Sequence, residues 1–261
     1  AMVAGERLAN RVHRNTAALY LARALFCLGQ WDEATATVTE VAPDTAPANR
    51  GMVMGPPVLV AIYRGERERA RSVIEDFDRS QAESGAAFES DYRSLREVAL
   101  AHLAEDRSAA QRVVVQAQPG DYGEWPTWLA LAVDLLVGLA SDDPLRAAVA
   151  ALQRDGVPRT SPMVTAQSAR LQAHLATRAH DMAAAASWWS TAIRTTGEAG
   201  MVFDQATLRV ERFEHVTHDE DARDGARRAA ATLAQLGATP WLARARDVLA
   251  TDAGSVADQR C

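Results

Sequence analysis

Apolar residues recur along this chain with the spacing of amphipathic helices, and short polar turns divide the helical stretches into pairs. The second helix of each pair carries an alanine shortly after the turn. These alanines are separated by 36, 40, 37 and 38 residues: Ala34, Ala70, Ala110, Ala147 and Ala185. A period of this length is typical of helical repeats, in which one hairpin buries its apolar face only when a neighbour stacks on it. We therefore expect an all-α superhelical solenoid.

The same pattern predicts about six antiparallel hairpins and a closing helix, forming one domain over residues 1–261. The expected helices are 6–28 with 32–42, 56–64 with 66–84, 88–104 with 106–117, 126–140 with 143–155, 162–179 with 181–198, 200–215 with 220–236, and a last helix at 239–250. Prolines and glycines crowd residues 43–57, which predicts a long loop. The tail at 251–261 has no apolar face, so we expect it to fray.

Each turn carries an acidic residue, which can accept hydrogen bonds from the free N–H groups of the helix that follows. We expect the alanines to mark close crossings of paired helices. The residues four positions later should fill the space between repeats: Val38, Ile74, Val114 and Trp189. The fourth hairpin is the weakest match, because Ala151 occupies that position and Arg154 follows it.

Charge and composition narrow the class of partner. The formal net charge is −6, and the basic residues, all arginine, are dispersed, which argues against a nucleic-acid surface. The longest apolar stretch, 129–140, is interrupted by Asp134 and is too short to span a bilayer. Cys27 is expected to be a buried free thiol and Cys261 a terminal one. We expect a cytoplasmic protein without a cofactor. Ala1-Met2 looks like an expression scar, which suggests an excised part of a longer protein.

Two stretches resemble tetratricopeptide (TPR) hairpins, ALFCLGQWDEATATVTEVAP at 24–43 and ATRAHDMAAAASWWSTAI at 176–193. The closing segment AATLAQLGATPWLARARDVL, at 230–249, resembles the end of the helical-repeat region in large bacterial signalling proteins. Those proteins join an AAA-type ATPase module to a class III adenylate/guanylate cyclase domain or to a LuxR-type helix-turn-helix. The resemblance implies a sensory or protein-interaction module of a signal-transduction or transcriptional regulator. The phosphate loop of such ATPases requires a lysine, and this chain has none.

The resemblance also implies a binding groove. In TPR folds the first helix of each hairpin lines the concave face, and its ligand-facing phase selects a polar stripe in the fifth hairpin: Gln167, Arg170, His174 and Arg178. In other hairpins it selects Arg23 and Phe26, Tyr92 and His102, and Leu136 and Leu139. Such a groove would suit a protein or peptide partner that carries carboxylates. A solvated face of a scaffold is the alternative.

Two further functions stay open. An enzyme could use the doublets His180-Asp181 and His218-Asp219, with His174 and His215 nearby, to hold a divalent metal that activates water for phosphoester hydrolysis. However, the doublets are separated by the repeat length, which favours capping turns, and we expect no metal and no catalysis.

A small-molecule sensor would need an enclosed pocket between hairpins. The aromatic side chains Trp125, Trp128 and Trp188 are the best candidates to line it.

Overall fold

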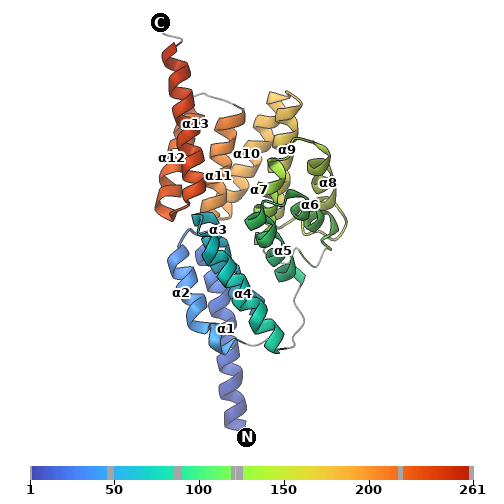
Figure 1. Ribbon diagram of the computed structural model, residues 1–261, viewed down its shortest axis with the longest axis vertical. Helices are drawn as coiled ribbons and strands as arrows, with labels where there is room; N and C mark the ends of the chain where they lie inside the picture. Colours follow the sequence, from blue (N-terminus) through green and yellow to red (C-terminus); the bar gives the residue numbers. More distant parts are fainter. Residues whose placement is uncertain are drawn as a thin grey trace.

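The computed structural model describes residues 2–45, 50–84, 90–118, 121, 126–216 and 220–258. The fold is all-α, as predicted, and these residues contain no β-strand (Figure 1). The helices are α1 (Met2–Cys27), α2 (Trp31–Val41), the 3₁₀ helix η1 (Ala42–Asp44), α3 (Arg50–Arg64), α4 (Arg67–Ser84), α5 (Ser90–Ala104), α6 (Arg107–Gln116), α7 (Thr127–Val137), α8 (Asp143–Leu152), α9 (Pro162–Arg178), α10 (Met182–Glu198), α11 (Val202–His215), α12 (Glu220–Leu236) and α13 (Thr239–Asp258).

Helices adjacent in the chain pack as hairpins, and each hairpin packs against the next. The pairs α1/α2, α3/α4, α5/α6, α9/α10 and α11/α12 are extensive. The first helices also form a continuous row, because α1 packs on α3, α3 on α5, α5 on α7 and α7 on α9. The fourth hairpin is splayed, since α8 packs mainly against α6 and α9 rather than against α7.

The hairpin turns share one backbone geometry. A residue with left-handed φ follows the first helix, and the next residue donates its N–H to the carbonyl five positions earlier, a recurring way to end a helix. The left-handed residues are Gly29, Gly65, Glu105, His180, Gly200 and Gly237. After two of these turns an aspartate caps the second helix, because Asp106 and Asp181 accept bonds of 3.0 Å from the N–H groups of Ala109 and Ala184.

Four of the five alanines lie at fully buried positions, with no exposed surface: Ala34, Ala70, Ala110 and Ala185. In the fourth hairpin the prediction was wrong by one residue. Ala147 is only partly buried, and Ala148 is 0% exposed. The register shift also places Leu152, 2% exposed, where Ala151 was expected to fill the space between hairpins. An apolar residue therefore does occupy this position, which explains why the pattern looked weak.

Two other predictions need correction. The expected loop at 43–57 is already helical from Arg50, and Pro56 and Pro57 lie inside α3. The helix persists because its apolar side chains are buried, and Gly51 lets α3 approach the Tyr92 ring, which a Cβ atom would meet at 2.2 Å. Residues 251–258 also remain helical instead of fraying, since Asp252 accepts a 2.7 Å bond from Arg223.

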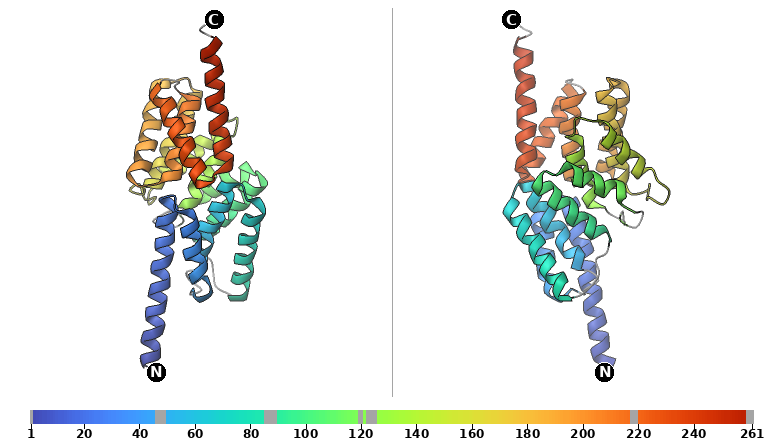
Figure 2. Two further views of the ribbon diagram at one scale, coloured as in Figure 1. Left: turned by 90° about the vertical axis from the view of Figure 1, so that its left-hand side faces the viewer. Right: turned by 45° about the vertical axis from the view of Figure 1, so that its right-hand side comes forward.

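Early and late hairpins contact each other. Arg64 Nε donates to the Leu236 carbonyl at 3.1 Å, and the rings of Tyr63 and Phe203 lie 4.1 Å apart. Helix α13 also packs on α3. The two termini nevertheless lie at opposite ends of the molecule, because α1 and α13 extend away from the shared contact (Figures 1 and 2). Among the described residues, we find no helix whose length and hydropathy would suit a bilayer crossing.

Candidate functional site

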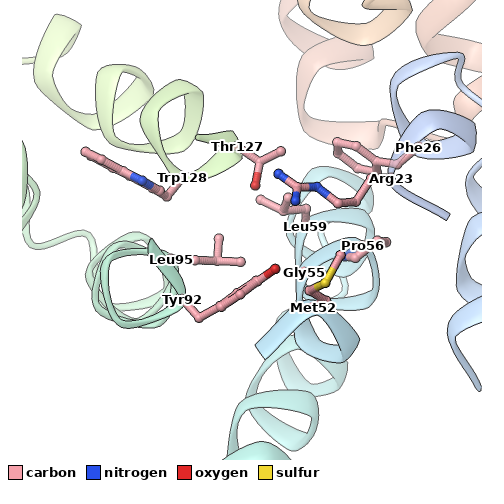
Figure 3. A pocket seen from close by; sticks show the side chains of 10 residues that line it. All are labelled: Arg23, Phe26, Met52, Gly55, Pro56, Leu59, Tyr92, Leu95, Thr127 and Trp128. Carbon is pink, nitrogen blue, oxygen red and sulfur yellow. The ribbon is translucent and has the colours of Figure 1, made fainter. Parts of the chain in front are cut away.

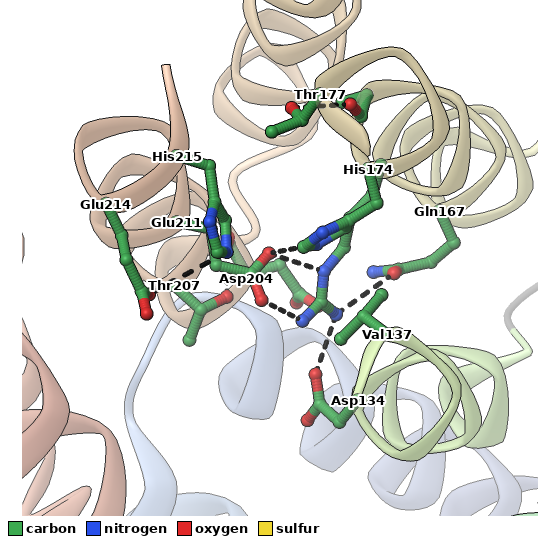
Figure 4. A network of polar contacts seen from close by, with 12 residues as sticks. Asp134, Val137, Gln167, His174, Thr177, Asp204, Thr207, Glu211, Glu214 and His215 are labelled. Carbon is green, nitrogen blue, oxygen red and sulfur yellow. Dashed lines mark hydrogen bonds and ion pairs between the residues drawn. The ribbon is translucent and has the colours of Figure 1, made fainter. Parts of the chain in front are cut away.

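A cluster of charged side chains lies where α7, α9 and α11 meet (Figure 4). Arg170 on α9 is 2% exposed. Its Nε and Nη2 atoms donate to the two carboxylate oxygens of Glu211 on α11 at 2.7 and 2.6 Å. Its Nη1 atom lies 2.7 Å from Oδ1 of Asp134 on α7. This planar arrangement satisfies the guanidinium in a buried site and joins three helices from successive hairpins.

The cluster is held in its charged form by mutual attraction. Burial alone would lower the pKa of Arg170, but Glu211 and Asp134 outweigh it and raise that pKa. Burial would likewise raise the pKa of Glu211, yet Arg170 and His174 bring it well below its ordinary value. For Asp134, burial dominates and the pKa rises despite Arg170. The bidentate pair is therefore the fixed element of the cluster.

Asp204 on α11 gives the cluster an excess of acid. It is 9% exposed, and burial raises its pKa to about 7, with Asp134 adding to the rise and Arg170 offsetting part of it. Near neutral pH this carboxyl is thus close to half protonated. The net charge at the centre of the molecule changes by one unit in that range.

Two histidines lie beside the ion pair. His174 is 5% exposed, and its Nε2 atom is 3.5 Å from Oε2 of Glu211, at the outer limit of hydrogen bonding. The His174 ring lies 5.0 Å from Trp189 and 5.2 Å from His215. Burial, and then the proximity of His174, lower the pKa of His215. Both rings are thus packed against other side chains.

Helix α13 covers one side of the cluster. Arg244 Nε donates to Oε2 of Glu214 at 2.9 Å, and its Nη1 atom reaches Oε1 of Glu211 at 3.4 Å. The guanidinium of Arg244 lies 4.7 Å from the centre of the Trp241 ring, a cation–π distance. Charged residues from four helices are therefore linked through Glu211.

The predicted open groove differs from this arrangement. Gln167, Arg170 and His174 do share one face of α9, but they are 1%, 2% and 5% exposed and line no solvent-filled trough. The physical reason is that α7 and α11 bring Asp134 and Glu211 onto this face. The carboxylates that we expected a partner to supply come from the chain itself.

The other predicted groove residues are dispersed. Arg178 caps the preceding hairpin, because its Nη2 atom donates to the carbonyls of Val137 and Leu139 at 2.9 and 2.7 Å, and its Nη1 atom pairs with Asp142 at 3.2 Å. Leu136 is fully buried in the apolar core. His102 is partly buried, and burial lowers its pKa. These residues do not converge on one site.

Three predicted residues do converge. Arg23 and Phe26 of α1 and Tyr92 of α5 line one pocket with Trp128 of α7, over a floor from α3. Figure 3 shows the Arg23 guanidinium and the hydroxyl groups of Tyr92 and Thr127 directed toward the same space. The cavity has a volume of about 20 Å³, enough for one water molecule. The remaining lining residues are Met52, Gly55, Pro56, Leu59 and Leu95.

The residues proposed for an enzyme or a sensor lie apart from these sites. His180 and Asp181 are exposed in a hairpin turn, where Asp181 caps α10. His218, Asp219 and Trp125 lie outside the described residues. Within the part of the chain that is described, no three His, Cys, Asp or Glu side chains are arranged to hold a metal ion. Trp188 is 40% exposed on α10, whereas Trp128 is buried against the pocket.

Sequence reasoning missed the acidic half of the ionic cluster, although two signals were present. Asp134 is a lone acid within the apolar stretch 129–140. The stripe selected on α9 recurs 37 residues later on α11, as Asp204, Thr207, Glu211 and His215. Opposite charges on matching faces of two successive first helices are the pattern that a buried ion pair requires.

The comparisons with known proteins give no match, whether with protein-family models, with curated proteins or with solved structures.

Proposed function

We propose that this chain is a non-enzymatic helical-repeat module that mediates protein interaction or effector sensing. In this proposal it belongs to a larger cytoplasmic bacterial regulator of signal transduction or transcription, and its hairpins form a TPR-like solenoid. The recurring left-handed turns and the buried alanines of the second helices support that architecture. Row-like packing of the first helices from α1 to α9 supports it as well.

The single observation that carries a binding role is the pocket at Arg23. Three hairpins contribute to it, and a guanidinium and two hydroxyl groups point into a mainly apolar space (Figure 3). A planar guanidinium favours carboxylates, and aromatic walls favour a partner side chain over water. Because the cavity holds about one water molecule, it would accept the tip of a side chain rather than a metabolite. We infer that the partner is a protein or peptide segment that places a carboxylate there.

Charge reversal tests this site. Wild-type protein and the Arg23→Glu variant would be used to capture partners from bacterial lysate, with Arg246→Glu, a change at an exposed position of α13, as the matched control. We expect a partner retained by the wild type and by Arg246→Glu to be lost with Arg23→Glu. Equal retention by all three proteins would contradict the proposed site. Circular dichroism of each variant would verify that the fold is intact.

A groove elsewhere favours the sensor as a second candidate function. Side chains of α2, η1, α3 and α4 surround a volume of about 430 Å³, within the range of small-molecule sites. Its walls are largely apolar, including Val38, Val53, Met54 and Phe77, with Asp76 at its polar part. A thermal-shift screen of metabolites with wild-type and Phe77→Ala protein would test it. A stabilising compound whose effect disappears in Phe77→Ala would support the sensor, and no stabilisation by any compound would count against it.

A further inference from the structure

Helix α1 presents an apolar face that no described helix covers. Tyr20, Leu21 and Leu28 are 52%, 54% and 55% exposed and are the three most exposed large hydrophobic residues of the described chain. Ala17 and Ala24 are also exposed and complete the same face. The opposite face is buried against α2 and α3 through Leu19, Ala22, Leu25 and Phe26.

This face has the shape of a helix-packing surface. It covers residues 17–28, about 17 Å of helix. The small side chains of Ala17 and Ala24 lie along its middle, and the larger Tyr20 and Leu21 lie on either side of them. A second helix could therefore approach the backbone of α1 closely and place its own side chains beside the alanines. Contiguous exposed apolar patches of this kind mark interaction surfaces.

We propose that this face pairs two copies of the chain through an antiparallel α1–α1 contact. The charges at its two ends are opposite. His13 and Arg14 are exposed at its N-terminal end, whereas Asp32, with an 87% exposed side chain, and the exposed Glu33 follow its C-terminal end. Antiparallel packing brings the basic end of each copy to the acidic end of its partner, and parallel packing would bring like charges together.

The proposed contact is self-complementary. A two-fold axis between Tyr20 and Leu21 places Ala17 of one copy opposite Ala24 of the other and packs each Tyr20 against the other Leu21. The N-terminal half of α1 extends beyond the other helices, so a second copy can lie beside it (Figure 2). The paired surface is distinct from the Arg23 pocket, because Arg23 points to the partly buried side of α1.

Sedimentation velocity across a dilution series tests the pairing. We expect a reversible monomer–dimer equilibrium for the wild type and a rise of at least about tenfold in the dimer dissociation constant for Leu21→Asp, about 1.4 kcal/mol. The matched control is Leu100→Asp on α5, where the leucine is 37% exposed and away from this face. It should leave the equilibrium unchanged. A wild-type monomer at every concentration, or equal effects of the two substitutions, would overturn the proposal.

Disulfide trapping tests the orientation. Ala17→Cys and Ala24→Cys would each be made with Cys27→Ser and Cys261→Ser, so that each chain has one thiol. Antiparallel pairing predicts cross-linked dimers on oxidation of a mixture of the two variants and few from either variant alone. Cross-linking of Ala17→Cys with itself, or no cross-link in the mixture, would refute this geometry. Neither experiment depends on the partner proposed for the Arg23 pocket.

Discussion

Two arginines selected by the same helical phase have different surroundings. Arg170 is 2% exposed and contacts carboxylates of Asp134 and Glu211. Arg23 is only partly buried, and the described residues that line its pocket with it are aromatic, aliphatic or hydroxyl-bearing. The sequence period selects the face of a helix, and the neighbouring hairpin decides what that face meets. Where the neighbour supplies an acid, the arginine becomes structural. At Arg23, a pocket remains that we propose as a binding site.

The strongest test of this comparison is Arg170→Met. The substitution removes the cation but leaves Glu211 and Asp134 buried without it, so we expect a loss of about 3 to 5 kcal/mol in the free energy of unfolding. Urea denaturation followed by circular dichroism measures it. The double variant Arg170→Met with Glu211→Met should recover part of the loss. A loss below about 1 kcal/mol for the single variant would mean that the cluster is not a structural element.

Asp204→Asn tests the excess acid of the same cluster. Since burial raises the pKa of Asp204 to about 7 from an ordinary 3.8, this group reduces stability progressively as pH rises between those values, and the full cost applies above the higher one. The amide variant should therefore gain about 2 to 4 kcal/mol near pH 8 and almost nothing near pH 4. Denaturation at both pH values measures the difference. Asp247→Asn, at an exposed site on α13, is the control, and an equal gain at both pH values would contradict the prediction.

His180→Gly changes a position outside both regions. His180 has φ of 59°, where a side chain is strained, and other hairpin turns place glycine there. We expect a gain of about 1 kcal/mol in unfolding free energy, measured by thermal or urea denaturation. If the variant is instead destabilised, the imidazole has a role beyond the turn, and the metal-binding hypothesis for His180-Asp181 would gain support.

Arg23→Ala should have the smallest effect on stability. Because we propose that this arginine serves binding, its loss should change the unfolding free energy by less than about 1 kcal/mol, even though Arg170→Met is costly. The same denaturation assay compares them directly. A loss as large as that of Arg170→Met would show that the two arginines play the same structural role, and the comparison would fail.

The local part of the fold could be predicted from the sequence because it depends on nearby residues. Helical periodicity located the hairpins, and the acids after the turns indicated caps that Asp106 and Asp181 do form. Errors arose where tertiary packing decides. Pro56 and Pro57 lie within a helix because burial of its apolar residues outweighs the lost hydrogen bonds, and one residue of register separates Ala147 from the buried Ala148.

The candidate site was harder to predict because polarity alone does not indicate exposure. His174 and Arg170 were correctly placed on one face of a helix, yet their burial depends on Glu211, which is 0% exposed and 41 residues from Arg170 in the chain. Pairing of two helical faces across a repeat is a non-local property. It becomes visible in the sequence only when the stripes of successive hairpins are compared for opposite charge.

The bond between Arg64 and the Leu236 carbonyl has a consequence for how the chain loses its structure. A linear array of repeats unravels from its weaker end, because each unit is held only by its immediate neighbours. Here a residue near the start holds a helix near the end, and the stacked rings of Tyr63 and Phe203 strengthen the same junction. Neither terminal region can detach without exposing the other, so fraying at one end is penalised at both.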